Sequence, residues 1–423
     1  MTDTPKIVIL GAGPIGLEAT LYARFLGYKV TLLERASTPA ANLQDWGHVK
    51  LFTPFSLNAS TLGVAAIGSQ LPDWQCPSAD ALLTGAEFLQ QYLEPLAKTD
   101  LIASSLQTGV KVLALGKTGW LKTEGVGNPD RAEAEFQILT RRADGSEETF
   151  TADIVIDCTG TYGNHNHLGS SGIPAIGEST AANHITYNLP DPTGRDRDNF
   201  LGKHTLIIGA GYSAATVITQ LAQLAAGNAS AETKATWITR NAERQSPLIR
   251  IPNDRLIERD TLAATANQFA ADSNGPVTHC AGTTINSIDY RSSTDDFQVE
   301  LDGEHPGIFT FDRIVANVGY HPDNRLYTEL QLHECYASSG PMKLAAALLV
   351  EKGIMADCLD QTTHGPESLV TTEPNFYILG SKSYGRNSNF LLSLGHEQIC
   401  DLFTIIGQRE DLDLYATMPA IDA

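Results

Sequence analysis

The sequence has few cysteines, and they are scattered. Its six cysteines stand at positions 76, 158, 280, 335, 358 and 400, and no CxxC pair occurs among them. This distribution indicates neither a disulfide-rich scaffold nor a redox-active dithiol. It predicts six reduced, buried thiols in a reducing cytoplasm.

Long apolar runs and an excess of basic residues are missing as well. No uncharged apolar run reaches about 18 residues, so we expect no membrane-spanning helix. The N-terminus lacks the basic start, apolar stretch and cleavage site of a secretory leader. The formal net charge of −20 argues against nucleic acid and anionic membrane surfaces as partners. An acidic, solvated surface explains that charge more simply.

What is present is an ordinary globular composition with abundant glycine. The chain has 423 residues, including 36 Gly and 20 Pro, with 42% hydrophobic and 18% charged residues. This length predicts about two or three domains.

The stretch 6–34 predicts a dinucleotide-binding βαβ unit. An apolar strand runs into a GxGxxG turn made by Gly11, Gly13 and Gly16, and a helix and a second strand follow. The helix N-terminus offers N–H groups and a positive dipole end to phosphates. Glu34 at the tip of the second strand can accept ribose hydroxyls and would repel a 2′-phosphate. We therefore expect FAD or NAD here, with a plain structural turn as the alternative.

The order of elements in the first part of the chain recurs later. A hairpin at 136–139 with a turn at 143–146 leads into the apolar strand 153–160, which ends in Gly160. A strand at 297–301 leads into 312–319, which has the same length and also ends in glycine. This repetition predicts an internal duplication.

The second copy carries its own nucleotide turn. The strand 204–208 runs into Gly209, Gly211 and Ala214, where alanine still permits close helix packing. The next strand, 235–239, ends at Arg240 rather than at an acid. Because a guanidinium pairs with a 2′-phosphate, this second site should prefer NADPH. The alternative is a solvated surface arginine.

Together these patterns predict an α/β protein with two Rossmann-like domains, the NADPH domain being inserted into the FAD domain. The expected FAD domain comprises 1–192 and 321–423, with the inserted domain at 193–320. The strand 375–380 should return to the first sheet, and the strand 110–115 should be the third strand of that sheet.

Four further local structures are expected from the sequence. A helix at 87–94 should end at Pro95, and 36–80 should be a loop-rich segment that builds a ligand site. A helix at about 390–406 should be capped by nearby Asn and Ser side chains. With its N-terminus toward the flavin pyrimidine edge, that last helix would stabilise negative charge on a reduced flavin.

These residues resemble the two-dinucleotide-binding-domain flavoproteins, a class that spans flavin-containing monooxygenases, N-hydroxylating monooxygenases and thioredoxin-reductase-like enzymes. The resemblance rests on both glycine turns, on Glu34, and on the strands ending at Gly160 and Gly319. Residues 199–214 are also similar to the lead into the NADPH domain of flavin-containing monooxygenases.

The resemblance implies hydride transfer from NADPH to FAD, capture of oxygen as a flavin hydroperoxide, and oxygenation of a small molecule by N-, S- or Baeyer-Villiger-type chemistry. NADP⁺ would act as a lid over a dry cavity. Two motifs depart from the class. The monooxygenase Phe-Gly and His spacing is not met by Ile176-Gly177 and His184, and the flavin-binding Gly-Asp is Gly380-Ser381 here. The missing cysteine pair disfavours a disulfide reductase.

The site residues follow from the motifs and the resemblance. For FAD they are Gly11, Gly13, Pro14, Ile15, Gly16, Glu34, Arg35, Trp46, Val112, Gly160, Gly380 and Asn389. For NADPH they are Gly209, Gly211, Tyr212, Ser213, Ala214 and Arg240. Candidate hydrogen-bond donors to the flavin are Asn58, Tyr384 and Arg386, although Asn58 could equally cap its own loop.

Several alternatives stay open. His165 and His167 could ligate a metal, but no supporting ligands stand at suitable spacing, so no metal is expected. The chain could instead pass electrons to a quinone or protein acceptor, or serve as a non-catalytic flavin sensor. A homodimer is compatible with the sequence.

Overall fold

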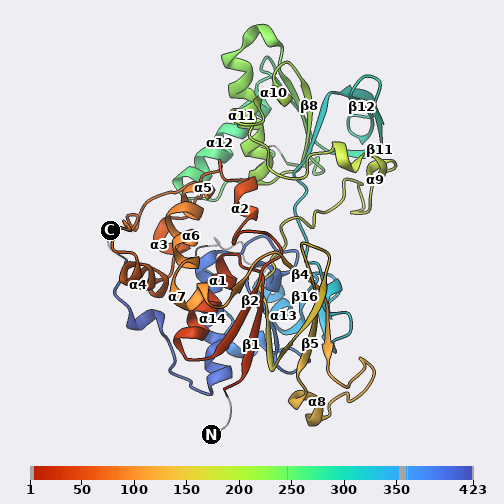
Figure 1. Cartoon of the computed structure of the whole chain (residues 1–423). Helices are drawn as coiled ribbons and strands as arrows, with labels where there is room; N and C mark the ends of the chain where they lie inside the picture. The colour runs from red at the N-terminus through yellow and green to blue at the C-terminus, as the bar shows by residue number, and fades with distance from the viewer. Residues whose placement is uncertain (1–3, 245, 352–358, 360, 422–423) are drawn as a thin grey trace. The chain divides into compact units, whose positions relative to one another are not determined.

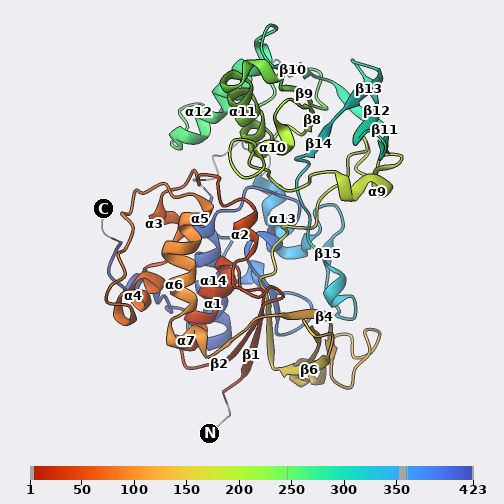
Figure 2. The same ribbon diagram turned by 45° about the horizontal axis from the view of Figure 1, so that its top comes forward.

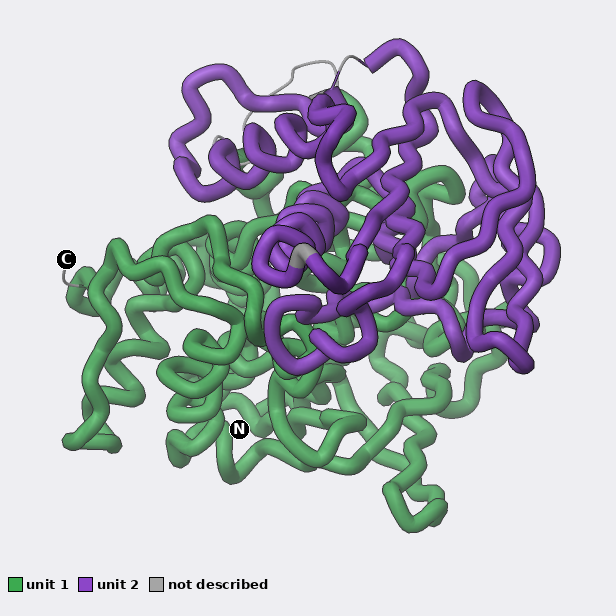
Figure 3. Tube along the Cα trace, turned by 90° about the horizontal axis from the view of Figure 1, so that it is seen from above, with its two compact units in different colours: residues 1–164, 321–423 green, residues 165–320 purple. Residues whose placement is uncertain are grey.

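The computed structural model describes residues 4–244, 246–351, 359 and 361–421. The chain forms two compact units, which Figure 3 shows in different colours: unit 1 comprises 1–164 and 321–423, and unit 2 comprises 165–320. Unit 2 is thus an insertion in unit 1. Within the described ranges, no helix is both long enough and apolar enough to span a membrane.

Unit 1 is built on a five-stranded parallel sheet with the order β17-β7-β1-β2-β3. Leu10 at the end of β1 lies opposite Leu33 on one side and Asp157 on the other, so the carboxyl ends of the strands share one edge. The expected return of the C-terminal strand is confirmed, because β17 pairs with β7. The strands are β1 (Lys6–Leu10), β2 (Lys29–Leu33), β3 (Leu106–Gln107), β7 (Ile154–Asp157) and β17 (Phe376–Ile378).

The continuous apolar sequence of β1 reflects burial on both faces of the sheet. Ile7 and Ile9 belong to the core beneath the helices, whereas Val8 and Leu10 belong to the core beneath a second, antiparallel sheet. In Figure 1, α1 and α14 lie on one side of β1 and β2, with β4 and β5 on the other. The antiparallel strands are β4 (Val110–Lys117), β5 (Phe136–Arg142) and β6 (Glu147–Ala152).

The remaining elements of unit 1 surround these layers. The helices are α1 (Pro14–Phe25), α2 (Asn42–Asp45), α3 (Phe55–Asn58), α4 (Thr61–Gln70), α5 (Gly85–Phe88), α6 (Glu94–Ala97), α7 (Asp100–Ala103), α8 (Pro129–Glu133), α13 (Met342–Glu351) and α14 (Leu392–Gly407). A two-stranded ribbon is formed by β15 (Glu334–Cys335) and β16 (Gly340–Pro341). Residues 36–80 are therefore partly helical rather than only loop.

The predicted third strand of the open sheet was wrong. The strand beside β2 is β3, which has only two residues and leaves almost no pattern in the sequence. Gly109, with a φ of 69°, then turns the chain. As a result β4, which begins at Val110, pairs antiparallel with β5 instead.

The predicted helix end at Pro95 was also wrong. A π-helical turn, Leu89–Leu93, follows α5, and the N–H of Glu94 donates to the Leu89 carbonyl. Pro95 then lies in the first turn of α6, where a missing N–H leaves no hydrogen bond unmade. The helix near the C-terminus also differs from expectation, because α14 has Leu391 at its N-cap instead of Asn or Ser.

Unit 2 repeats the layers of unit 1. Its parallel sheet has the order β10-β9-β8-β14. Figure 2 shows α11 and α12 on one side of this sheet and β11, β12 and β13 on the other. The elements are α9 (Glu178–Ala181), α10 (Arg197–Phe200), β8 (His204–Ile208), α11 (Tyr212–Gly227), β9 (Lys234–Ile238), α12 (Ile257–Ala271), β10 (Val277–Cys280), β11 (Thr283–Arg291), β12 (Asp296–Gly303), β13 (Gly307–Phe311) and β14 (Arg313–Ala316).

Residues 165–192, which the sequence analysis assigned to the first part of the FAD domain, belong to unit 2 by their contacts. Ile176 forms a bridge with Ser287 of β11, and Thr186 forms one with Val315 of β14. These backbone bridges attach the segment to both sheets of unit 2. At the other end, unit 2 ends at residue 320.

Candidate functional site

The glycine turn of unit 1 lies between β1 and α1. Gly11 has a φ of 89°, and a Cβ on it would lie 2.9 Å from the Cys158 carbonyl oxygen. A Cβ on Gly16 would lie 1.9 Å from the Gly11 oxygen. At Gly13, the N-cap of α1, an added Cβ would meet no described atom within 4 Å. Two glycines are thus required by close packing, and the third leaves space in front of the helix N-terminus, where a phosphate fits.

Glu34 is held in place by this turn. Its carboxylate accepts hydrogen bonds from the backbone N–H groups of Ala12 and Ala36, each at 2.8 Å. Each carboxylate oxygen has further lone pairs, so both can accept hydroxyl groups as well. The side chain therefore presents a fixed, partly exposed acid at the tip of β2, beside the glycine turn.

The turns after β7 and β17 lie at the same edge of the sheet. A Cβ on Gly380 would approach Ile15 of α1 to 3.3 Å, and one on Gly160 would lie 3.6 Å from the Ser381 hydroxyl. Both glycines have positive φ values, 67° at Gly160 and 73° at Gly380. The structure therefore brings together Gly11, Ile15, Gly160 and Gly380, which are distant in the sequence.

A buried ion pair supports this edge and was missed from the sequence. Lys382 Nζ donates to Asp157 Oδ2 at 2.6 Å, and both side chains are completely buried. The same ammonium group donates to the Thr159 hydroxyl at 3.1 Å and to the Asp323 carbonyl at 2.9 Å. One cation thus ties together three chain segments. The sequence did contain one signal for this pair, because an acidic residue stands at the end of an apolar strand. A carboxylate that is buried there needs a cationic or hydrogen-bonding partner.

The turn 380–384 is also tied to α14. The N–H of Gly380 donates to Gln398 Oε1 at 2.9 Å, and Gln398 Nε2 donates to the Ser383 hydroxyl at 3.0 Å. Ser383 in turn donates to the Gly380 carbonyl. The position of this turn is therefore set by buried side chains, which sequence patterns alone did not identify.

The glycine turn of unit 2 has the same construction. Gly209 has a φ of 129°, and a Cβ on it would lie 2.2 Å from the Asn317 carbonyl oxygen. A Cβ on Gly211, the N-cap of α11, would have no described neighbour within 4 Å. Ala214 takes the third position and is completely buried. This helix N-terminus, like that of α1, faces free space.

The tip of β9 differs from the tip of β2. Arg240 follows the last residues of the strand and is exposed. Tyr212 and Ser213 begin α11 beside it in the sequence. The second turn is thus combined with a solvent-facing cation where the first is combined with a fixed acid.

The three candidate donors have different surroundings. Asn58 is buried, donates to the Thr53 carbonyl at 2.9 Å and accepts from the Thr53 hydroxyl at 2.7 Å, so its side chain caps its own loop. Tyr384 is buried and packs edge-on against Phe390. Arg386 is exposed, and its backbone N–H donates to Ser338.

The other residues predicted to bind FAD have the following neighbours in the structure. Trp46 packs against Gly85, Arg35 lies beside Gly163, Val112 packs into the core beneath β4, and Asn389 is exposed before α14. The ring of His165 stacks on Tyr187 with a centroid distance of 3.5 Å. In the part of the chain that the structure describes, no group of three or more His, Cys, Asp or Glu could hold a metal.

The described cysteines at 158, 280 and 400 are free thiols, and Cys358 lies outside the described residues. Burial raises the pKa of Cys158 well above its ordinary value, and burial raises the pKa of Cys400 to about 11. Cys76 is exposed and Cys335 and Cys400 are only partly buried, contrary to the expectation that all six are buried. Since the thiolate is the reactive form, the buried thiols are poorly suited to disulfide chemistry.

We compared the chain with known protein families and solved structures. Residues 6–47 match the family model of the pyridine nucleotide-disulphide oxidoreductases. Bacillithiol disulfide reductase from Bacillus cereus is similar over 96% of this chain and 100% of its own, with 18% identity and a TM-score of 0.66. An ornithine N-hydroxylase from Kutzneria sp. 744 is similar over 96% and 100%, with 13% identity and a TM-score of 0.61. The chain has the two-dinucleotide-binding flavoprotein fold.

Thioredoxin reductase from T. acidophilum shares this flavoprotein fold, with 16% identity, coverage of 95% and 98%, and a TM-score of 0.56. No curated protein matches the sequence. Reductases and hydroxylases are thus both among the similar structures, and at these identities the likeness establishes the fold alone.

Proposed function

We propose that the chain is an NADPH-dependent flavoprotein monooxygenase that oxygenates a small molecule, with FAD bound by unit 1 and NADPH by unit 2. The observation that carries the proposal is the pair of glycine turns, each at the N-terminus of a helix, with opposite charges at the adjoining strand tips. Glu34 suits an unphosphorylated ribose, and Arg240 suits a 2′-phosphate.

The residues of unit 1 provide the groups that FAD requires. Free N–H groups at the start of α1 would bind the pyrophosphate, and Glu34 would accept the ribose hydroxyls. Gly160, Ser381 and Gly380 would line the flavin, with Ser381 in place of the usual acid. Leu391 has no side-chain acceptor, so the N–H groups at the start of α14 would be available to the flavin pyrimidine. Bound FAD would supply hydride acceptance and oxygen activation.

The state of the cysteines favours oxygenation over disulfide reduction. A disulfide reductase needs a reactive thiolate, whereas burial raises the pKa of the thiols at 158, 280 and 400. Two of the similar structures are an ornithine N-hydroxylase and a cadaverine monooxygenase. An amine is therefore a reasonable first substrate class to test, with thioethers and ketones beside it.

The test measures the fate of electrons in the FAD-loaded protein. We expect NADPH to bleach the flavin, and NADPH consumption with oxygen to yield an oxygenated product when a suitable amine, thioether or ketone is present. Release of hydrogen peroxide alone with every substrate, together with rapid reduction of a quinone, would instead identify the alternative, an electron-transferring oxidoreductase. A flavin that NADPH does not bleach would indicate a non-catalytic sensor.

A further inference from the structure

Unit 1 contains a cavity outside the residues assigned to either dinucleotide. Its volume is about 520 Å³, which lies in the range of small-molecule sites. It is lined by Lys122, Asn164, His321, Pro322, Asp323, Asn324, Arg325, Tyr327, Thr328, Leu330, Leu332 and Glu334. The lining combines aliphatic and aromatic surface with a small number of charged groups.

One wall of the cavity is an extended segment whose side chains alternate between two sides. Leu330, Leu332 and Glu334 line the cavity. The intervening Gln331 and His333 face the other way, where their N–H groups donate to Glu373 Oε2 and to the Thr372 hydroxyl. Period-two alternation would place an apolar residue at the third cavity position. A carboxylate stands there instead.

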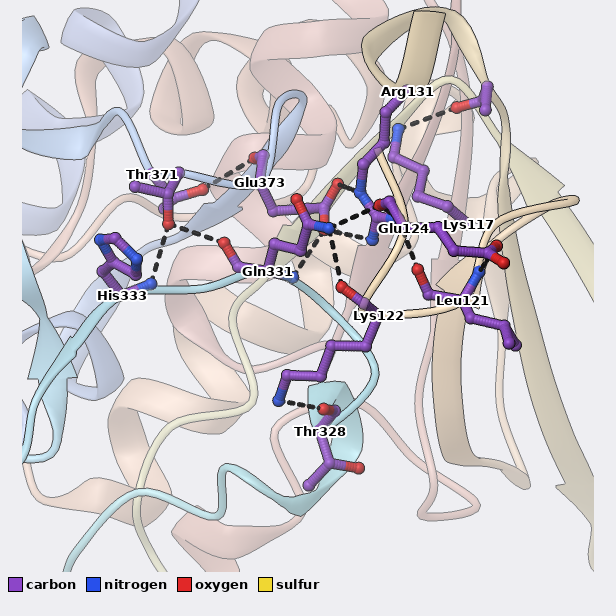
Figure 4. A network of polar contacts seen from close by, with 12 residues as sticks. Lys117, Leu121, Lys122, Glu124, Arg131, Thr328, Gln331, His333, Thr371 and Glu373 are labelled. Atoms are coloured by element: carbon purple, nitrogen blue, oxygen red, sulfur yellow. Dashed lines mark hydrogen bonds and ion pairs between the residues drawn. The ribbon is translucent and has the colours of Figure 1, made fainter. Parts of the chain in front are cut away.

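This wall is held from behind by a buried network, shown in Figure 4. Arg131 forms a two-point ion pair with Glu373, at 3.1 and 2.8 Å, and both side chains are almost fully buried. Gln331 Nε2 donates to the carbonyls of Lys122 and Glu124, each at 2.7 Å. The position of the wall is therefore fixed before any ligand arrives, which reduces the entropy lost on binding.

The carboxylate of Glu334 has an unsatisfied oxygen. Its Oε1 is shielded from solvent and has no hydrogen-bond partner among the described residues. The side chains of Asn324 and Tyr327 hydrogen-bond to the carboxylate and lower its pKa, yet burial is the larger effect and raises the pKa overall. A buried acceptor without a donor is energetically unfavourable, because its desolvation is not compensated. A ligand that brings N–H donors would remove this cost.

The other charged groups around the cavity already have partners. Asp323 pairs with Arg325 at 2.6 Å, and Lys122 Nζ donates to the Thr328 carbonyl at 2.5 Å. Lys382, behind the cavity, pairs with Asp157. Glu334 is thus the lining carboxylate that takes part in no ion pair among the described residues. An added cation would meet it without displacing an existing salt bridge.

The chemistry of the lining separates the possible cations. A metal ion needs several oxygen, nitrogen or sulfur ligands, and no described group of His, Cys, Asp and Glu offers three. An alkylammonium ion needs one strong acceptor and an apolar surface for its chain. Glu334 supplies the acceptor, and Leu330 and Leu332 supply the surface on the same wall.

We propose that this cavity binds a small primary alkylammonium ion, with its ammonium group on the Glu334 carboxylate and its chain against Leu330 and Leu332. The site is separate from the proposed cofactor sites and does not rest on the proposed function. Asp323 lines the cavity and its carbonyl accepts from Lys382. Ligand binding there would therefore contact the ion-pair network that supports the dinucleotide edge.

The test is calorimetric titration of the full chain, loaded with FAD where it binds, with propylammonium chloride. We expect saturable binding at one site, and Glu334→Gln should weaken it about 10-fold or more because a charge-assisted hydrogen bond is lost. Glu329→Gln, which removes an exposed carboxylate outside the cavity, is the matched control and should bind like the wild type. Leu332→Phe keeps the acid but fills the cavity and should also weaken binding.

Three results would overturn the proposal: heats that do not saturate with the wild type, equal affinity of Glu334→Gln and Glu329→Gln, or binding of the uncharged isostere 1-propanol as strongly as propylammonium. Thermal unfolding of each variant verifies that it is folded. If Glu334→Gln does not fold, the Leu332→Phe and 1-propanol measurements decide the matter. Because the readout is binding heat, failure here leaves the oxygenation test unaffected.

Discussion

Unit 1 and unit 2 close their parallel sheets with the same hydrogen bonds. Asp153, just before β7, accepts from the Lys6 N–H at 2.7 Å, and Asp312, just before β14, accepts from the His204 N–H at 2.8 Å. In each case the aspartate N–H donates back to the same residue. The internal duplication expected from sequence thus extends to individual backbone contacts.

The two units differ in which side chains occupy equivalent positions. Counting from the paired aspartates, Asp157 in unit 1 corresponds to Ala316 in unit 2. Counting from the glycine turns, Glu18 corresponds to Thr216. Unit 1 therefore buries an ion pair and a carboxyl group where unit 2 has small or neutral side chains. The backbone plan is shared, and the charges give each copy its own properties.

The largest expected loss of stability comes from breaking the Asp157–Lys382 ion pair, whose aspartate corresponds to Ala316 in unit 2. Lys382→Met leaves Asp157 buried without a partner and should lower the free energy of unfolding by about 3–5 kcal/mol. The double variant Asp157→Ala with Lys382→Met makes unit 1 resemble unit 2 and should recover much of this loss. Urea unfolding of both variants measures the difference. A double variant as unstable as the single one would contradict this account.

The third small residue of each turn gives the next comparison. Gly16→Ala would place a Cβ 1.9 Å from the Gly11 oxygen and should destabilise unit 1 by at least about 3 kcal/mol. Ala214→Gly in unit 2 creates no clash and should cost only about 1 kcal/mol through helix propensity. Chemical unfolding of the two variants compares these costs. Equal losses would mean that the two turns are packed alike.

Glu18 and His396 predict opposing pH effects within unit 1. Burial raises the pKa of Glu18 from 4.5 to about 7, so the stability it contributes falls as pH rises through that interval. Burial lowers the pKa of His396 from 6.5 to about 4, so its contribution is lost as pH falls through that interval. The two slopes nearly cancel between about pH 4.5 and 6.5.

Glu18→Gln should therefore make stability rise with pH across this window, by up to about 3 kcal/mol. His396→Gln should make it fall by a similar amount. Thermal unfolding across the pH range measures both slopes, and Thr216→Val in unit 2 is the control, with no change in slope expected. Parallel curves for wild type and both unit 1 variants would show that neither group titrates as described.

The smallest expected effect concerns the strand tips and depends on the proposed function. Arg240→Ala should weaken NADPH binding about 10-fold, through loss of a charge-assisted contact, and should leave NADH binding nearly unchanged. Fluorescence titration with both nucleotides measures this. Arg244→Ala, in the same loop, serves as the control. Equal losses for NADPH and NADH would remove the assignment of Arg240 to the 2′-phosphate.

The sequence predicted the parallel strands and both glycine turns because their signals are local. β1 is buried and apolar from Ile7 to Leu10, and β8 is buried and apolar from Leu206 to Ile208. A close backbone approach demands glycine at positions 11 and 209. The sequence did not predict β3, because a strand of two residues shows no periodicity. The predicted helix end at Pro95 was wrong because a π-helical turn lets the helix continue.

By itself, the sequence determined the architecture: two dinucleotide folds, one inserted into the other, with an acid at one strand tip and a guanidinium at the other. Only the tertiary structure decided the partners of the buried charges. Lys382 meets Asp157 and Arg131 meets Glu373, across separations that no local pattern encodes, while Glu334 Oε1 has no hydrogen-bond donor among the described residues. Such pairs form only when distant chain segments meet in the low-dielectric interior. A buried charge without a partner there destabilises the folded protein.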